Sequence, residues 1–121
     1  MGFGQAISYC FSNYANFNGR GTRSEFWWFY LFVIIVNFGA VIVLGAALGF
    51  DSAASTGLAV LVSLVFLIPL YAAGSRRMHD TGRSGWMQLL LLIPCVGPII
   101  VIVFWAQPSQ VGDNAYGPQP G

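Results

Sequence analysis

The side chains best suited to chemistry lie in one short segment, residues 76–86, with the sequence RRMHDTGRSGW. The segment contains the only histidine of the chain and one of its four acidic residues, adjacent as His79 and Asp80. A histidine beside a carboxylate can act as a general base for a hydroxyl nucleophile. Thr81 and Ser84 follow in the same segment, so an interfacial enzyme is one hypothesis.

A structural role explains the same residues with fewer requirements. A zinc site needs three or four converging ligands, whereas Cys10 and Cys95 stand far apart in sequence and no second histidine is present. The triplet Asp80-Thr81-Gly82 matches an aspartic-protease motif, but that chemistry needs two carboxylates that share a proton. We therefore predict no catalytic residue, no metal ion and no cofactor, and we favour a non-enzymatic protein.

The same segment carries three of the five cations of the chain, all of which are arginine. One guanidinium at the centre of a membrane helix costs about 2.5–3.5 kcal/mol on insertion scales. Long apolar runs flank the segment, so its arginines predict a loop at a membrane–water boundary. A guanidinium forks onto phosphates and carboxylates. The expected contacts to anionic lipid headgroups or to a partner protein come from Arg20, Arg23, Arg76, Arg77 and Arg83.

The other residues of this loop are expected to shape it. Gly82 and Gly85 permit tight turns, and Trp86 belongs to a residue type that is enriched at membrane interfaces. We expect His79 and Asp80 to be structural, because a carboxylate among guanidiniums accepts strong, charge-assisted hydrogen bonds.

The composition of the chain predicts a membrane protein. Of the 121 residues 56% are hydrophobic and only 7% are charged, whereas a soluble domain usually carries about 25% charged residues. One small core cannot hide so much apolar surface, so the excess must face lipid. The net charge of +1 argues against a nucleic-acid-binding protein, which needs a dense basic face.

We predict a single all-α membrane domain over residues 1–121, with one interfacial helix and three transmembrane helices. Apolar residues at three- and four-residue intervals predict an amphipathic helix at 3–14, which is too short to span a bilayer. The predicted transmembrane helices cover residues 26–50, 57–73 and 86–105, and an irregular tail covers 106–121.

Two prolines, Pro94 and Pro98, interrupt the third apolar run near its centre. Each proline removes a backbone donor and clashes with the preceding turn. A single crossing that is kinked at 94–98 is the favoured arrangement. The alternative is a re-entrant hairpin, which is tolerated only where protein covers the freed backbone groups.

Two polar features accompany the first span. Thr22 and Glu25 have the spacing of a capping box, in which the threonine hydroxyl accepts from the glutamate amide and the carboxylate reaches back. Asn37 lies near the middle of the span, where an asparagine usually bonds to a neighbouring helix. The alternative role for Asn37 is to line a transport path together with the proline break.

The distribution of the cations predicts the orientation of the chain. Arg20 and Arg23 precede the first span, and the other three arginines lie between the second and the third. Cytoplasmic segments carry the excess of arginine and lysine, so we expect the N-terminus and the arginine-rich loop in the cytoplasm. Three crossings would then place the C-terminus in the periplasm.

Two motifs resemble those of a known family. FNGRGTRSEFW at residues 17–27 is similar to its Phe-x-Gly-Arg-x-x-Arg-x-Glu-aromatic-Trp opening. RRMHDTGRSGW at residues 76–86 is similar to its central Arg-Arg-Leu-His-Asp-x-Gly-Arg-Ser-Gly-Trp, and the closing YGP at 116–118 also fits. The chain thus resembles the bacterial inner-membrane family of unknown function numbered 805. The resemblance implies a multi-pass protein of the bacterial inner membrane and supplies no activity.

We therefore predict a small non-enzymatic inner-membrane module whose partners are membrane lipids, above all anionic ones. A membrane protein partner or a second copy of the chain is a further candidate. The runner-up function is a subunit of an oligomeric channel or transporter, followed by an interfacial enzyme that uses His79 and Asp80.

Overall fold

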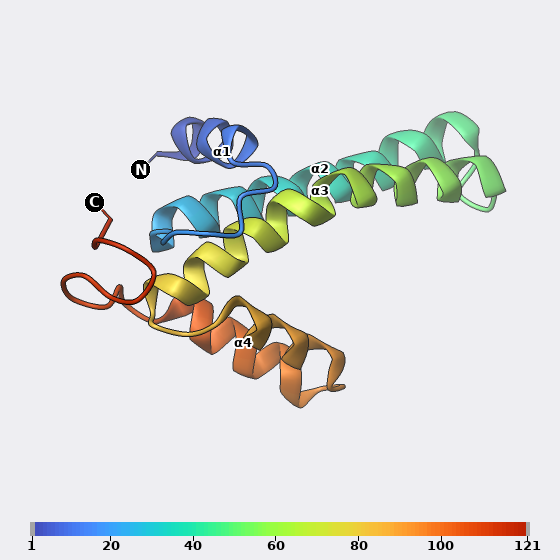
Figure 1. Ribbon diagram of the computed structural model, residues 1–121. Helices are drawn as coiled ribbons and strands as arrows, with labels where there is room; N and C mark the ends of the chain where they lie inside the picture. The colour runs from blue at the N-terminus through green and yellow to red at the C-terminus, as the bar shows by residue number, and fades with distance from the viewer. Residues whose placement is uncertain (1, 121) are drawn as a thin grey trace.

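The computed structural model describes residues 2–120, and over these residues the regular structure is helical (Figure 1). The predicted all-α class is confirmed for this part of the chain. Positions 1 and 121, which the predicted domain includes, lie outside the described residues. The elements are α1 (Phe3–Ser12), α2 (Arg23–Leu48), α3 (Ala53–Asp80), the 3-10 helix η1 (Gly85–Leu92) and α4 (Val96–Ala106).

Helices α2 and α3 form a long antiparallel hairpin that extends away from the rest of the molecule (Figure 1). Both are long and apolar enough to cross a membrane, and only 11% and 17% of their most apolar stretches are buried. The spans predicted at 26–50 and 57–73 therefore coincide with two helices that can cross a hydrocarbon core of about 30 Å. With 28 residues, α3 is longer than predicted at both ends.

A polar pair joins these two helices. The hydroxyl of Ser63 on α3 donates to the side-chain oxygen of Asn37 on α2 at 2.6 Å. The side-chain amide of Asn37 donates to the carbonyl of Val33 at 2.9 Å. The predicted bond from Asn37 to a neighbouring helix is confirmed. Such an interhelical bond in a membrane contributes about 1 kcal/mol or less.

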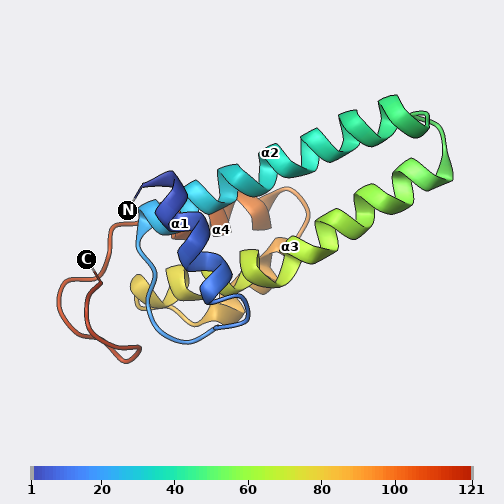
Figure 2. The same ribbon diagram turned by 90° about the horizontal axis from the view of Figure 1, so that it is seen from above.

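Helix α1 lies across the open end of the α2–α3 hairpin (Figure 2). Ala6 and Cys10 of α1 are fully buried, and the ring of Phe11 packs edge-on against Phe29 of α2, with ring centroids 5.7 Å apart. The apolar face that the spacing predicts is therefore the face that packs against protein. The helix ends at Ser12, before the predicted end at residue 14.

The third apolar run forms a hairpin. The prediction of one kinked helix over residues 86–105 is therefore wrong. η1 and α4 lie side by side and are joined by a tight turn (Figure 1). Cys95 in this turn has a φ of 66°. The two segments approach closely. A Cβ added to Gly97 of α4 would lie 1.7 Å from the carbonyl oxygen of Leu90 of η1.

The positions of the prolines explain this break. Pro98 lies in the first turn of α4, where a backbone N–H has no intrahelical partner to lose. Pro94 follows Ile93, whose backbone is extended (φ −82°, ψ 115°), as is usual before a proline. Each proline therefore suits the edge of a helix, and together they end one segment and begin the next.

Candidate functional site

The candidate site is the end of the molecule at which α3 stops. α3 continues through Asp80, so residues 76–80 form its last turns and not a loop, which corrects the prediction. Arg76, Arg77 and Asp80 are each at most 1% exposed. Charges buried this deeply need opposite charges and hydrogen bonds around them. The arginine network, as we call it, consists of Arg20, Glu25, Arg76, Arg77 and Asp80.

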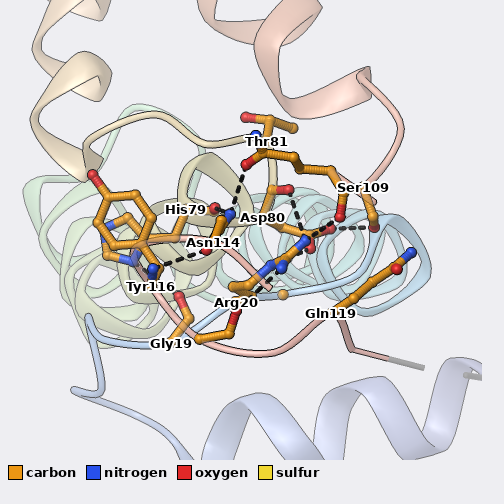
Figure 3. A network of polar contacts seen from close by, with 12 residues as sticks. Gly19, Arg20, His79, Asp80, Thr81, Ser109, Asn114, Tyr116 and Gln119 are labelled. Carbon is orange, nitrogen blue, oxygen red and sulfur yellow. Dashed lines mark hydrogen bonds and ion pairs between the residues drawn. The ribbon is translucent and has the colours of Figure 1, made fainter. Parts of the chain in front are cut away.

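Asp80 is the centre of one half of the arginine network (Figure 3). Its Oδ1 accepts from Nε of Arg20 at 3.0 Å, and its Oδ2 accepts from Nη1 of Arg77 at 2.5 Å. The hydroxyl of Ser109 also donates to Oδ2. One carboxylate therefore joins the loop before α2, the end of α3 and the C-terminal tail.

Arg20 also binds the tail directly through its terminal nitrogens. They donate to the carbonyls of Gln110 at 2.5 Å, Gly112 at 2.6 Å and Gly117 at 3.2 Å. Figure 3 shows Arg20 between Asp80 and the tail. Residues 107–120 thus lie at the same end of the molecule as the loop before α2. The predicted third crossing would instead have placed the tail and this loop on opposite sides of the membrane.

Arg76 and Glu25 form the second half of the arginine network. Nη2 and Nε of Arg76 donate to one oxygen of Glu25 at 2.7 and 3.2 Å. Nη1 of Arg76 donates to the carbonyls of Asn13 and Asn16 at 3.2 and 2.7 Å. The predicted threonine cap is present, because the Thr22 hydroxyl accepts from the Glu25 amide at 3.2 Å. Glu25 thus has a second role that the capping-box interpretation did not include.

Cys10 of α1 covers this half of the network. Its Sγ lies 3.9 Å from a carboxylate oxygen of Glu25 and 3.9 Å from Nη2 of Arg76. Burial, followed by the neighbouring charge of Glu25, raises the pKa of the Cys10 thiol to about 12. The thiol is therefore neutral at physiological pH and is not in the thiolate form that a nucleophile needs.

Arg77 fastens the η1–α4 hairpin to α3. Nε of Arg77 donates to the carbonyl of Trp105 at 2.8 Å, and Nη2 donates to the carbonyl of Gln107. Nη1 donates to the carbonyl of Gly21 at 3.0 Å. The carbonyls at the C-terminus of α4 are the negative end of its dipole, which favours a cation there. The ring of Trp105 packs on Phe26 of α2, with centroids 4.6 Å apart.

In the described part of the chain, His79 and Asp80 do not form the pair that the enzyme hypothesis requires. Nδ1 of His79 lies 2.9 Å from the carbonyl oxygen of Gly19. The imidazole stacks on the ring of Tyr116 at 4.0 Å (Figure 3). The Asp80 carboxylate is bound within the arginine network instead. Among residues 2–120, no three His, Cys, Asp or Glu side chains gather closely enough to hold a metal ion.

The two other arginines are more exposed than the arginine network. Arg23 is exposed at the start of α2. Arg83 is half-buried in the turn after α3, with its guanidinium 4.3 Å from the centre of the Phe104 ring. A guanidinium over an aromatic face gains a cation–π attraction while its edge stays free for hydrogen bonds.

The predicted turn is short and covers residues 81–84, between α3 and η1. Gly82 has a φ of 80°, in the left-handed region that favours glycine. Gly85 lies so close to α3 that an added Cβ would lie 2.2 Å from Oγ of Ser75. Trp86 follows at the start of η1, with 78% of its surface exposed.

Sequence reasoning missed the groups of the tail that bind the arginine network. We expected residues 106–121 to be irregular and solvent-facing, yet Ser109 and the carbonyls of three tail residues bind Asp80 and Arg20. The resemblance of residues 116–118 to a closing family motif was the signal that could have found this contact. Tyr116 of that motif stacks on His79 of the central motif.

Comparisons with known proteins bear on the same segments. The family described as "Protein of unknown function (DUF805)" matches residues 14–118. Inner membrane protein YhaH of Escherichia coli (strain K12) is 41% identical over 109 residues, which cover 89% of this chain and 89% of that protein. Inner membrane protein YhaI of the same strain is 38% identical over 109 residues, covering 89% of this chain and 88% of that protein. No solved structure matches the chain. The family match spans both arginine motifs and the tail that binds them, and the chain therefore belongs to the DUF805 family.

Proposed function

We propose that this protein is a non-enzymatic inner-membrane module whose arginine network holds its cytoplasmic end together. The observation that supports this is the binding of Arg20, Arg76 and Arg77 to protein carboxylates and carbonyls. Because these guanidiniums are already bonded inside the protein, contact with anionic lipid headgroups is left to Arg23 and Arg83. Both lie at the end of the molecule where the arginine network lies.

The proposed topology has two crossings and one re-entrant hairpin, with both termini in the cytoplasm. η1 and α4 have 8 and 11 residues, and at about 2.0 and 1.5 Å per residue each reaches roughly 16 Å. That is about half of a hydrocarbon core of roughly 30 Å. The hairpin packs against α3, which supplies the protein cover that a re-entrant segment needs. The positive-inside rule places the arginine-rich end in the cytoplasm.

A reporter protein that works only in the cytoplasm is expected to be active when it is fused after Gly121. The physical reason is that Arg20 binds carbonyls of the tail, so the tail and the N-terminal loop share one side. A reporter inserted at Asp51, between α2 and α3, is the matched control and should be active only in a periplasmic form. An active periplasmic reporter after Gly121 would mean a third crossing and would end the re-entrant proposal.

Replacement of Arg23 and Arg83 by glutamine is expected to reduce the enrichment of anionic lipids that co-purify with the protein. Each cation near an anionic surface contributes about 1 kcal/mol, or roughly fivefold in binding. The ratio of anionic to zwitterionic lipid, determined by mass spectrometry after mild extraction, measures the effect for the two single variants and the double variant.

Two controls accompany this measurement. Asp51→Asn changes one exposed charge at the opposite end of the molecule and should leave the lipid ratio unchanged. The melting temperature of the double variant should fall only slightly, because both arginines lie outside the arginine network and the loss of the cation–π contact between Arg83 and Phe104 costs about 0.5–1 kcal/mol. An unchanged lipid ratio in a folded double variant would contradict the proposed headgroup contact.

The two features behind the transport hypothesis have structural explanations. Asn37 is bonded to Ser63 on the neighbouring helix. The break at residues 94–98 is the turn of a hairpin. We therefore do not extend the proposal to a channel or transporter.

A further inference from the structure

A cavity of about 640 Å³ lies where η1 meets the end of α3 and the loop before α2. This volume is within the range of about 300–1,000 Å³ that is typical of small-molecule sites. One part of its wall is apolar and includes Trp86, Leu89 and Leu92 of η1. The other part is polar and includes His79 at the end of α3 and Ser84 in the following turn.

The apolar part of the wall is open to the surroundings of the protein. Trp86, Leu89 and Leu92 are 78%, 56% and 79% exposed. In the proposed topology, on which this inference rests, side chains this exposed at the start of the re-entrant hairpin face acyl chains or the interface. A molecule that enters the cavity past them would come from the bilayer and would have an apolar body.

The wall carries no formal charge from arginine, aspartate or glutamate, since none of the described residues that line the cavity is of these types. A phosphate inside the cavity would lose hydration without gaining a cationic partner, which is costly. The polar head of the bound molecule is therefore expected to be uncharged.

His79 supplies one hydrogen-bond acceptor among the residues that line the cavity. Its Nδ1 lies 2.9 Å from the carbonyl oxygen of Gly19, and a carbonyl oxygen can only accept, so Nδ1 carries a proton. In the neutral imidazole Nε2 is then a bare acceptor. No donor from residues 2–120 is bonded to Nε2, and Tyr116 covers one face of the ring (Figure 3). A bound molecule with a hydroxyl group would donate to Nε2.

The hydroxyl of Ser84 complements this acceptor on the same wall. It accepts from the backbone N–H of Trp86 at 3.3 Å, which leaves its own proton free to donate. A hydroxyl group both donates and accepts, so a wall that offers Nε2 of His79 and the proton of Ser84 suits a hydroxyl better than it suits an ester or an ether.

We propose that this cavity binds a neutral membrane amphiphile with a hydroxyl group on its head. The apolar body lies along Leu89, Leu92 and Trp86, and the hydroxyl donates to Nε2 of His79. A diacylglycerol and a reduced quinone both have this chemistry. The site is independent of the proposed headgroup contact, because it uses none of the arginines and selects against an anionic head.

The site can be mapped with the full-length protein in vesicles of zwitterionic phospholipid that contain a trace of photoreactive diacylglycerol. Labelling is expected to concentrate on residues 86–92 and to exceed that of residues 99–103 of α4, which also include outward-facing side chains. Leu89→Trp fills the cavity and should reduce the labelling of 86–92 several-fold. The matched control, Ile102→Trp, places the same ring on the exposed face of α4 and should leave it unchanged.

The hydroxyl is tested by competition and by a substitution. Unlabelled diacylglycerol should compete with the probe roughly two- to tenfold better than its methyl ether, which lacks the donor. His79→Asn can keep the bond to Gly19 but has no acceptor at the position of Nε2, and it should abolish that difference. A comparison of how well an unlabelled quinol and unlabelled diacylglycerol displace the probe then identifies which molecule supplies the hydroxyl.

Three results would each overturn this proposal. The first is equal labelling of residues 86–92 and 99–103, and the second is unchanged labelling in Leu89→Trp. The third is equal competition by the diacylglycerol and its methyl ether, which is measured on the parent protein and does not depend on the folding of any variant. Loss of anionic-lipid enrichment in the Arg23 and Arg83 variants bears only on the proposed function.

Discussion

Asp80→Ala is expected to destabilise the protein by about 3–5 kcal/mol, the usual cost of removing one partner from a buried ion pair. The Asp80 carboxylate is fully buried and accepts from Arg20, Arg77 and Ser109. Without it, two buried guanidiniums lose their shared counter-charge. The tail should also loosen, because Ser109 and Arg20 attach it to the same carboxylate.

Thermal or denaturant unfolding in detergent measures this effect. Asp80→Asn should fall between the alanine variant and the parent, since it keeps one acceptor oxygen but not the charge. Asp113→Asn, which changes an exposed carboxylate in the tail, is the matched control and should change stability by less than about 0.5 kcal/mol. If both Asp80 variants are at least as stable as the parent, the structural role of Asp80 is wrong. The better hypothesis is then that Asp80 is a functional acid that lowers the stability of the protein.

Arg76→Met and Glu25→Leu are each expected to cost about 3–5 kcal/mol for the same reason, because each leaves the opposite charge buried without its partner. The Arg76 and Glu25 side chains are 1% and 4% exposed and lie 2.7 Å apart. The double variant removes both charges together. It should therefore cost less than the sum of the two single variants, by about 0.5–3 kcal/mol.

The comparison of the four proteins isolates the pair from the other bonds of Arg76. The carbonyls of Asn13 and Asn16 lose their guanidinium donor in Arg76→Met and equally in the double variant, so that loss cancels in the coupling energy. Arg23→Gln combined with Asp51→Asn, two exposed charges at opposite ends of α2, should be additive. If the stability losses of Glu25→Leu and Arg76→Met were also additive, the proposed ion pair between these residues would be contradicted.

Features that depend on neighbouring residues could be predicted from the sequence. Thr22 caps α2 through the amide three positions later, because an N-terminal helical turn leaves that donor without an intrahelical partner. The long uncharged run after Glu25 predicts a membrane-length helix from composition alone. Asn37 indicates a bonded partner, since an amide without one is costly among apolar groups, although the sequence does not say that the partner is Ser63.

The placement of the arginines could not be predicted in this way. The cost of a guanidinium in a membrane led to the interpretation of residues 76–80 as a loop, and the structure instead continues α3 through them. The decisive partners are remote, since Arg76 meets Glu25 at a separation of 51 positions and Arg20 meets Gly117 at a separation of 97. A charge is tolerated in a buried helix end when such partners surround it. The pattern of neighbouring residues in the sequence does not indicate where these partners lie.

By itself, the sequence determined the membrane class, the two long helices and the end of the molecule at which charge gathers. These follow from residue type and spacing along one dimension. Only the tertiary structure decided that the run broken by Pro94 and Pro98 returns as a hairpin, and that the tail meets Arg20. A proline break is equally compatible with a kink and with a reversal. The choice depends on whether packing can hold both segments, and here both segments pack on α3, and Arg77 binds the carbonyls of Trp105 and Gln107 at the end of α4.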